Sequence, residues 1–239
     1  MLTSIKAGSY HREVTLVLQM LLWSNRRLTL EACNDAVVVR PETKPRFSAR
    51  DQFFDRRDIV TICSGLVITV WSSSSSIDCQ YLQLAHASVR EYLLSQKIIR
   101  PFRSQLKERC ARACLLRLCH AYLGRIDWST LGSRPDELDQ TFPLADWAAS
   151  TWPEHAGFLE TVDEDMLTSV LEFLQQACVL SKHFLSYSIT PFYWFDTTQC
   201  YPLYLAALMG LRYTCRQLIQ SGSADTSKQL ARVLMDTQN

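Results

Sequence analysis

The chain has 239 residues, of which 47% are hydrophobic and 21% are charged, so it can bury a core and is not a disordered tail. Its 25 Lys and Arg residues balance 24 Asp and Glu residues, and this even charge gives no overall attraction to nucleic acid or to an acidic partner. The seven glycines form neither a phosphate-binding loop, nor a dinucleotide-binding loop, nor the G-x-S-x-G turn of serine hydrolases. These common nucleotide-binding and hydrolase motifs are therefore excluded.

The N-terminus lacks the apolar run of a signal peptide, and the densest apolar stretch, residues 14–23, is far shorter than the ~20 residues of a membrane span. The nine cysteines are an odd number, which favours reduced thiols over a disulfide framework. We therefore expect a cytoplasmic protein with no membrane span, and a nuclear location stays open.

The first half of the chain predicts three helices, a β-hairpin and a closing helix. The helices are expected at residues 14–23, at residues 30–39 with Thr29 as N-cap, and from Asp55 to a stop at Gly65. Strands at 67–71 and 81–86 flank a serine-rich tip, and the spacing of Ser88 and Glu91 predicts a capping box that opens the last helix. This order is that of a winged-helix domain, here residues 10–97. Alanine at position 88 should then cost about 1 kcal/mol of stability.

The second half predicts helices at 102–123, 142–152 and 166–180, the shorter one stopped by Pro153, and then an irregular aromatic stretch at 183–201. Residues 201–210, YPLYLAALMG, match the ankyrin opening T-P-L-H-x-A with tyrosine in place of Thr and His. A second helix at 211–221 and the Gly222–Asp225 segment complete one repeat, and residues 229–234 could begin another. We expect a helical linker at 98–198 and a single, partly degenerate ankyrin repeat at 199–226.

Together these parts resemble the region between the NACHT nucleotide-binding domain and the ankyrin array of fungal NACHT–ankyrin proteins, which are NOD-like receptors of the STAND class. The winged helix is similar to the GPI inositol-deacylase-type winged-helix domain, and the linker to the helices that follow it. The residues that carry the resemblance are LW at 22–23, RLTLE at 27–31, ICSGLV at 62–67, LAHASVREYLL at 84–94, PLADWAA at 143–149 and WPEHA at 152–156.

The resemblance implies a mainly α fold and a non-catalytic regulatory or protein-interaction module in signalling. In such proteins the nucleotide site lies in the NACHT domain, which this chain lacks, and the ankyrin repeats bind partners. We therefore expect no cofactor, no bound nucleotide, no catalytic residue and no metal. The expected partner is a protein: a NACHT domain or further ankyrin repeats in cis, or another protein.

A single ankyrin repeat leaves apolar residues in need of cover, because such repeats are stable as stacks of about three or more. The preceding helix and aromatic stretch can cover one side, and few apolar residues remain to cover the other. The sequence therefore predicts an exposed protein-interaction edge formed by Leu211, Cys215, Leu218 and Ile219.

Several cysteines and histidines are candidates for metal binding or catalysis, and each also has a structural role available to it. Cys110, Cys114, Cys119 and His120 could bind a metal, but they diverge around a helix without a C-x-x-C pair, which favours core thiols. His86 and His155 are expected to make structural hydrogen bonds at helix ends. A Cys-His pair for thiol or metal hydrolysis stays a distant alternative.

Nucleic-acid binding is the main rival function, because winged helices often read DNA. The expected recognition helix begins Asp55-Arg56-Arg57-Asp58, which is too evenly charged for a phosphate contact surface. Further along the chain, basic and acidic residues occupy two separate segments. Residues 97–125 hold eight basic side chains and one acidic, and residues 126–170 hold ten acidic and one basic. We expect these two segments to pair internally, and a basic face for nucleic acid or anionic lipid is the alternative.

Overall fold

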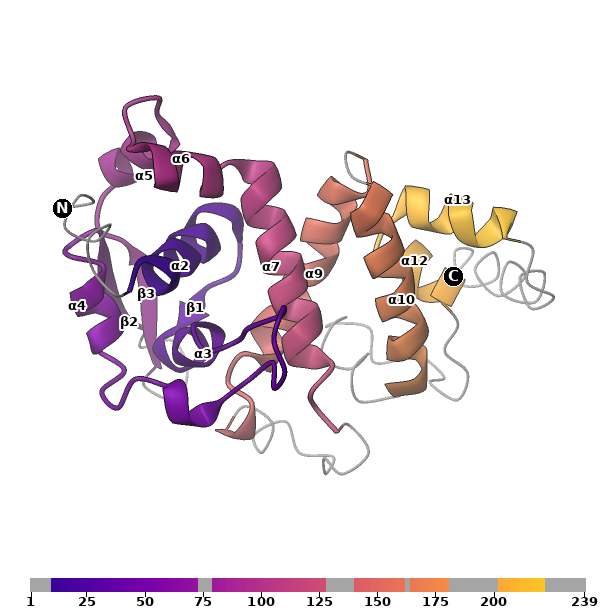
Figure 1. Cartoon of the computed structure of the whole chain (residues 1–239), viewed down its shortest axis with the longest axis horizontal. Helices are drawn as coiled ribbons and strands as arrows, with labels where there is room; N and C mark the ends of the chain where they lie inside the picture. The colour runs from indigo at the N-terminus through magenta and orange to yellow at the C-terminus, as the bar shows by residue number, and fades with distance from the viewer. Residues whose placement is uncertain (1–9, 73–78, 128–139, 162–163, 181–201, 222–239) are drawn as a thin grey trace.

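The computed structural model describes residues 10–72, 79–127, 140–161, 164–180 and 202–221 (Figure 1). Within these ranges the chain is mainly helical with a small three-stranded antiparallel sheet, an arrangement compatible with a winged helix followed by helices. The predicted fold class is confirmed. The expected aromatic stretch at 183–201, the end of the repeat at 222–225 and the segment 229–234 lie outside the described residues.

Three helices begin the described part of the chain: α2 (His11–Trp23), α3 (Leu30–Ala36) and α4 (Asp58–Ile62). Thr29 caps α3 as predicted, because its hydroxyl accepts a hydrogen bond from the Ala32 amide at 3.1 Å. The third helix begins later than expected. Asp55 turns its carboxylate to the Arg57 amide at 2.9 Å, which makes a local turn ahead of α4 instead of capping it.

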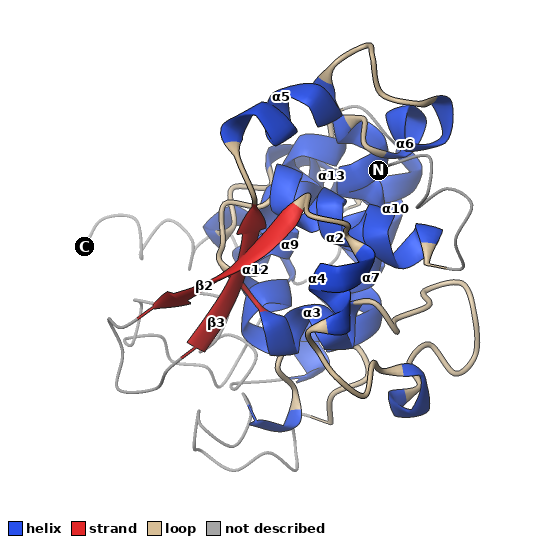
Figure 2. Cartoon of the chain, turned by 90° about the vertical axis from the view of Figure 1, so that its left-hand side faces the viewer, coloured by secondary structure: helices blue, strands red, loops and turns tan. Residues whose placement is uncertain are grey.

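The sheet contains β1 (Leu28–Thr29), β2 (Val67–Ser72) and β3 (Cys79–Leu84) in the order β1-β3-β2. The predicted hairpin is present, although β3 begins two residues before the expected start at Tyr81. Figure 2 shows the hairpin on one side of the helical body. Ser64 and Gly65 both take positive φ angles, 49° and 75°, which turn the chain from α4 into β2.

The helix after the hairpin, α5 (Ala87–Leu94), is capped by a residue other than the predicted one. Its N-cap is His86, whose Nδ1 accepts from the Ser88 amide at 3.1 Å and lies 2.9 Å from the Ser88 hydroxyl. The expected capping box of Ser88 and Glu91 is therefore wrong. The His86 imidazole, two residues before Ser88, accepts the hydrogen bond of the free Ser88 amide and so caps the helix itself. The structural role expected for His86 is confirmed.

His86→Ala is accordingly expected to lower the free energy of unfolding by about 1 kcal/mol, since the free amide at the start of α5 loses its acceptor. Ser88→Ala should lower it by less than half of that, because the Ser88 amide stays capped. Denaturant unfolding of both variants checks the order. Equal effects would restore Ser88 as the cap.

The predicted helix at 102–123 is two helices, α6 (Arg100–Gln105) and α7 (Glu108–Leu123). Two side chains of α2 bind the carbonyls at the break: Gln19 donates to the Gln105 oxygen at 2.8 Å, and Trp23 donates to the Leu106 oxygen at 3.0 Å. These long-range bonds satisfy the backbone groups that a continuous helix would use for itself.

Helices α9 (Ala145–Leu159) and α10 (Glu164–Leu180) follow, and then α12 (Pro202–Leu208) and α13 (Arg212–Gln220). The predicted stop at Pro153 is wrong: α9 continues through the proline for another six residues. Three residues beyond it, His155, Ala156 and Leu159, are fully buried, and this burial outweighs the hydrogen bond that proline cannot make.

One continuous hydrophobic core runs from α2 through α7 and α9 to Leu211. Helix α7 occupies its middle and packs against both α2 and α9, so it joins the winged-helix part to the helices that follow (Figure 1). Among the described residues, no helix combines the length and hydropathy that crossing a membrane would require.

Candidate interaction surface

The C-terminal helix pair α12–α13 and the turn between its helices contain all four residues of the predicted interaction edge. Gly210, with φ of 72°, makes the turn between the helices, and the Leu211 amide bonds back to the Ala206 carbonyl at 2.9 Å. The pair packs on α10 (Figure 1).

Leu211 does not belong to the exposed edge, which corrects the prediction. It is fully buried at the start of α13, and its Cδ2 lies 3.8 Å from the place that a Cβ on Gly157 would occupy. Leu211 thus packs on α9 beside Gly157. A local sequence pattern cannot show this, because the two residues are far apart along the chain.

The other three edge residues lie further along α13. Cys215 and Leu218 are half-buried and pack against the core, and Ile219 is 45% exposed. Tyr213, which the sequence analysis did not single out, is also 45% exposed, and the Arg216 guanidinium lies 5.6 Å from its ring centre. The exposed residues of α13 are Arg212, Tyr213, Arg216, Gln217, Ile219 and Gln220, and its exposed aromatic and aliphatic side chains are Tyr213 and Ile219, with Arg216 beside Tyr213. We call Tyr213, Arg216 and Ile219 the outer face of α13.

A buried carboxylate fixes α13 to the preceding helices. Glu160, at the end of α9, is only 8% exposed, and its Oε2 accepts from the Thr214 amide at 3.0 Å and from the Thr214 hydroxyl at 2.8 Å. Thr214 lies in the first turn of α13, where free amides and the helix dipole favour a negative charge. Burial, and then the Glu160 charge, raise the pKa of the neighbouring Cys215 thiol to about 11.

Glu160→Ala is expected to lower the free energy of unfolding by about 2 kcal/mol, because Thr214 loses an ionised hydrogen-bond acceptor in a buried place. Amide exchange in residues 212–220 should speed up more than exchange in α7. The matched control is Glu172→Ala on the exposed side of α10, which should change neither quantity. Unchanged exchange in α13 would contradict this account of its docking.

Arg112 of α7 contacts side chains of both α2 and α9. It pairs with Glu108 at 2.9 Å and with Glu154 of α9 at 3.2 Å, and its guanidinium lies 5.9 Å from the Trp23 ring and 5.0 Å from the Phe158 ring. The pair with Glu154 joins the basic segment 97–125 to the acidic segment 126–170, as the charge pattern predicted. Helices α2, α7 and α9 thus share one cation.

A second polar contact joins the winged-helix part to α7. The Asp35 carboxylate of α3 accepts from the Tyr122 hydroxyl and from the Gln52 amide. Burial raises the pKa of Asp35, and its two donors and the nearby Arg125 charge partly offset that rise. Arg125 also lies over the Phe47 ring at 3.4 Å. These contacts lock α3 to the end of α7.

Two histidines pack between the helices, His155 inside α9 and His120 in the last turn of α7. His155 lies inside α9, which corrects its expected position, and its Nδ1 is 3.4 Å from the Arg112 guanidinium. His120 of α7 stacks on Phe173 with ring centres 3.9 Å apart. Burial lowers the pKa of each to about 3, and the Arg112 charge adds to this effect at His155. Both rings are neutral at physiological pH.

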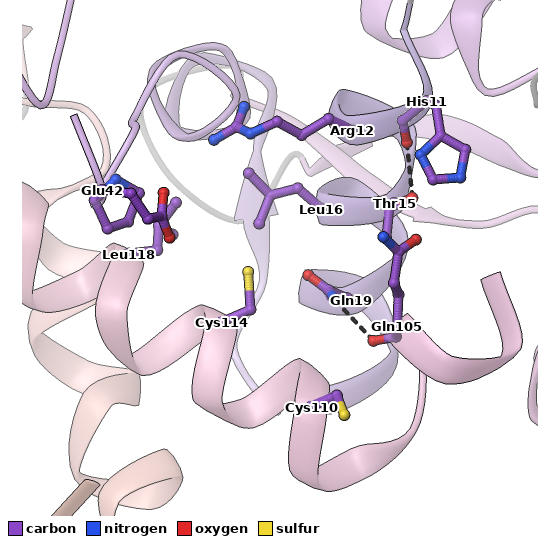
Figure 3. A pocket seen from close by; sticks show the side chains of 11 residues that line it. His11, Arg12, Thr15, Leu16, Gln19, Glu42, Gln105, Cys110, Cys114 and Leu118 are labelled. Carbon is purple, nitrogen blue, oxygen red and sulfur yellow. Dashed lines mark hydrogen bonds between the residues drawn. The ribbon is translucent and has the colours of Figure 1, made fainter. Parts of the chain in front are cut away.

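A small pocket of about 260 Å³ lies between α2 and α7 (Figure 3). Among its polar side chains, Thr15 donates to the His11 carbonyl at 2.7 Å, Gln19 bonds the Gln105 carbonyl, and Arg12 donates to the Val37 carbonyl at 2.8 Å. The His11 Nε2 is buried with no partner among the described residues. Figure 3 shows the Cys114 thiol pointing toward Leu16.

The candidate metal ligands do not converge. Cys110 is exposed, Cys114 is half-buried, Cys119 is buried beside Thr151 at 3.8 Å, and His120 is engaged with Phe173. Burial raises the pKa of the Cys119 thiol to about 12. Within the described ranges, no group of three His, Cys, Asp or Glu residues is placed to hold a metal ion.

The helix expected to read DNA is short and mixed in charge. Helix α4 has five residues, and Arg56, just before it, is paired with Glu31 at 3.0 Å. The other exposed side chains at its start are Arg57 and Asp58, of opposite charge. A major-groove helix needs a row of outward basic or amide side chains, which α4 does not present.

Comparison with known proteins gives one distant relative. The chain is 26% identical over 235 residues to the azaphilone pigments biosynthesis cluster protein L of Monascus ruber, an alignment that covers 92% of this chain and 49% of that protein. The chain thus spans about half the length of this relative. No family model matches the chain, and no solved structure is significantly similar to it.

Proposed function

We propose that this chain is a non-catalytic regulatory and protein-interaction module of the NACHT–ankyrin type, and that it binds its partner through the outer face of α13. The observation that supports this proposal most is the uneven burial of the helix pair α12–α13. Its inner side is docked on α9 and α10, whereas Tyr213 and Ile219 remain exposed on the other side. Partly exposed aromatic and aliphatic side chains beside an arginine are typical of the centre of an interaction surface.

The contacts between the parts support a regulatory role. The Asp35–Tyr122 bond joins the winged-helix part to α7, Arg112 joins α7 to α9, and Glu160 joins α9 to α13. A displacement of the winged-helix part would therefore move the outer face of α13, because the packed helices α7 and α9 connect the two. The distant relative is named for a pigment biosynthesis cluster, and its name states no reaction.

The partner we propose is the protein chain that continues the stack: further ankyrin-type helix pairs, in cis or on another polypeptide. The length of the relative, of which the alignment covers 49%, leaves room for such additional chain. A further helix pair packed on α13 would cover Ile219 and Tyr213 as neighbouring repeats cover one another.

The test compares amide exchange in residues 202–220 of the 239-residue chain alone and with the flanking segments of its encoded protein present. We expect exchange in α13 to slow when the flanking segments are present. Tyr213→Ala combined with Ile219→Ala should abolish that slowing, and the control pair Tyr92→Ala with Leu94→Ala, exposed on α5, should not. Exchange in α13 that does not respond to any flanking segment would overturn the proposal.

A further inference from the structure

A pocket of about 460 Å³ lies where the loop that follows α3 meets the C-terminal end of α7. Figure 1 shows the chain after α3 passing beside that end of α7, and Figure 2 shows the same part of the molecule turned by 90°. Three basic residues line the pocket: Lys44 and Arg46 from the loop, and Arg125 from just beyond α7. The apolar side chains of Pro45 and Phe47 line it as well. In the described part of the chain, no carboxylate lines this pocket.

Backbone hydrogen bonds hold the loop in place beside α7. Val39 and Phe47 form an antiparallel bridge at its base, and the Arg40 amide donates to the Arg46 carbonyl at 2.7 Å. Phe47 packs against the core, with its ring centre 6.1 Å from that of Tyr122 in α7. The basic side chains of the loop are therefore carried by a positioned backbone, and they share one pocket with a cation from another element.

Aromatic rings hold the Arg125 guanidinium at this place. It lies 3.4 Å from the centre of the Phe47 ring, 4.7 Å from that of Tyr122 and 5.2 Å from that of Phe142. Its Nη1 is buried with no hydrogen-bond partner among the described residues. The Arg125 charge acts on the pKa of Asp35, but the Asp35 carboxylate is hydrogen-bonded to other side chains. Buried donors are normally hydrogen-bonded, so this guanidinium retains donors for an added acceptor.

The charges around the pocket do not balance. Against its three cations stand the nearby Asp35 carboxylate and the C-terminal end of α7, which carries about half a negative charge. Glu42 and Asp127 are close by in sequence, but neither lines this pocket. An excess of about 1.5 positive charges remains. Because like charges brought together from two elements repel each other, an anion bound between them stabilises the arrangement.

We propose that this pocket binds a small phosphate monoester, with its phosphate bound by Lys44, Arg46 and Arg125 and its organic group packed on Pro45 and Phe47. A phosphate monoester carries about 1.5 to 2 negative charges at pH 7, which matches the excess charge of the pocket. Arginine binds phosphate through paired hydrogen bonds, and lysine adds a point charge. The ligand bridges the loop and α7 beside the existing bond between Asp35 and Tyr122.

The size and surroundings of the pocket favour a free small molecule as the occupant. Its volume lies within the range of about 300 to 1,000 Å³ that is usual for small-molecule sites. None of the large apolar side chains that are exposed in the described ranges lines it, so a membrane or a protein would gain little apolar contact there. The site does not depend on the outer face of α13.

The first experiment titrates the full 239-residue chain with phenyl phosphate in a calorimeter. We expect one-to-one binding, about tenfold tighter than that of phenyl sulfate, which has the same ring and one charge less. Inorganic phosphate should bind more weakly than phenyl phosphate, because it leaves Pro45 and Phe47 uncovered. No binding of phenyl phosphate, or equal affinity for the sulfate, would overturn the proposal. Binding to vesicles that contain phosphatidic acid, without binding of free phenyl phosphate, would overturn it too.

Two variants in the loop test the assignment without altering the core. Lys44→Gln and Arg46→Gln should each weaken phenyl phosphate binding about tenfold and leave unfolding by denaturant unchanged, since both residues are exposed. The matched control Arg50→Gln removes the same charge from an exposed residue outside the pocket and should bind as the natural chain does. Amide exchange in residues 40–47 should slow on binding in the natural chain and in this control. Equal losses of affinity in all three variants, or no loss in either loop variant, would refute the site.

Discussion

Trp152→Ala is expected to lower the free energy of unfolding by about 3 kcal/mol, at the low end of the range for removing a large aromatic from a core. Trp152 is fully buried on α9, edge-on to Phe173 of α10 with ring centres 5.1 Å apart and to His120 of α7 at 5.6 Å. Its loss leaves a cavity where three helices meet. Its indole Nε1 is buried without a hydrogen-bond partner in the described ranges, so removing that donor offsets a small part of the loss.

The matched control is Trp71→Ala, because Trp71 is the same residue type on the exposed hairpin. This variant should change the unfolding free energy by less than about 0.5 kcal/mol in dilute, monomeric protein. Denaturant unfolding followed by circular dichroism measures both variants. Equal effects of the two substitutions would show that α7, α9 and α10 do not pack as described.

Local signals in the sequence predicted the elements well where the decisive contacts are also local. The hydroxyl of Thr29 caps a helix that begins at the next residue, and the β-branched run at 67–71 forms β2. Glycines at 65 and 210 take the positive φ angles at which helices end. These features involve residues within a few positions of one another, so a single sequence is enough to read them.

Predictions failed where a distant part of the chain changes the local outcome. Side chains of Gln19 and Trp23 take the carbonyls that divide residues 102–123 into two helices. Burial against the core carries α9 through Pro153, and packing against α9 buries Leu211. Periodicity shows that a residue lies on a helix face, but it cannot show which neighbour covers that face.

The candidate surface was accordingly predicted in part. Ile219 is exposed as expected, Leu211 is not, and Tyr213 was missed because one aromatic at an outer position carries no signal of its own. The Glu160–Thr214 contact spans 54 residues, so no spacing rule reveals it. The residues that position the surface are thus harder to find from sequence than those that form it.

The two buried histidines make the protein sensitive to acid. In the unfolded chain a histidine has a pKa of about 6.5, whereas burial lowers the pKa of His120 and His155 to about 3 in the folded chain. Between these values the unfolded chain binds protons that the folded chain does not. The stability that depends on neutral histidines is therefore fully present above pH 6.5 and is lost as the pH falls toward 3.

Within that window each histidine should lower the free energy of unfolding by about 1.4 kcal/mol per pH unit, so the pair should dominate acid unfolding. Burial raises the pKa of Asp35 and Asp146, which acts in the opposite direction, so the informative quantity is the difference between the natural chain and a variant. In His120→Phe combined with His155→Leu, unfolding free energies measured from pH 7 to pH 4 should fall much less steeply. His86→Asn keeps a capping side chain at an exposed position and should follow the natural chain. A double variant as acid-sensitive as the natural chain would mean that the pKa values of these imidazoles are not lowered in the folded chain and that other groups cause its acid unfolding.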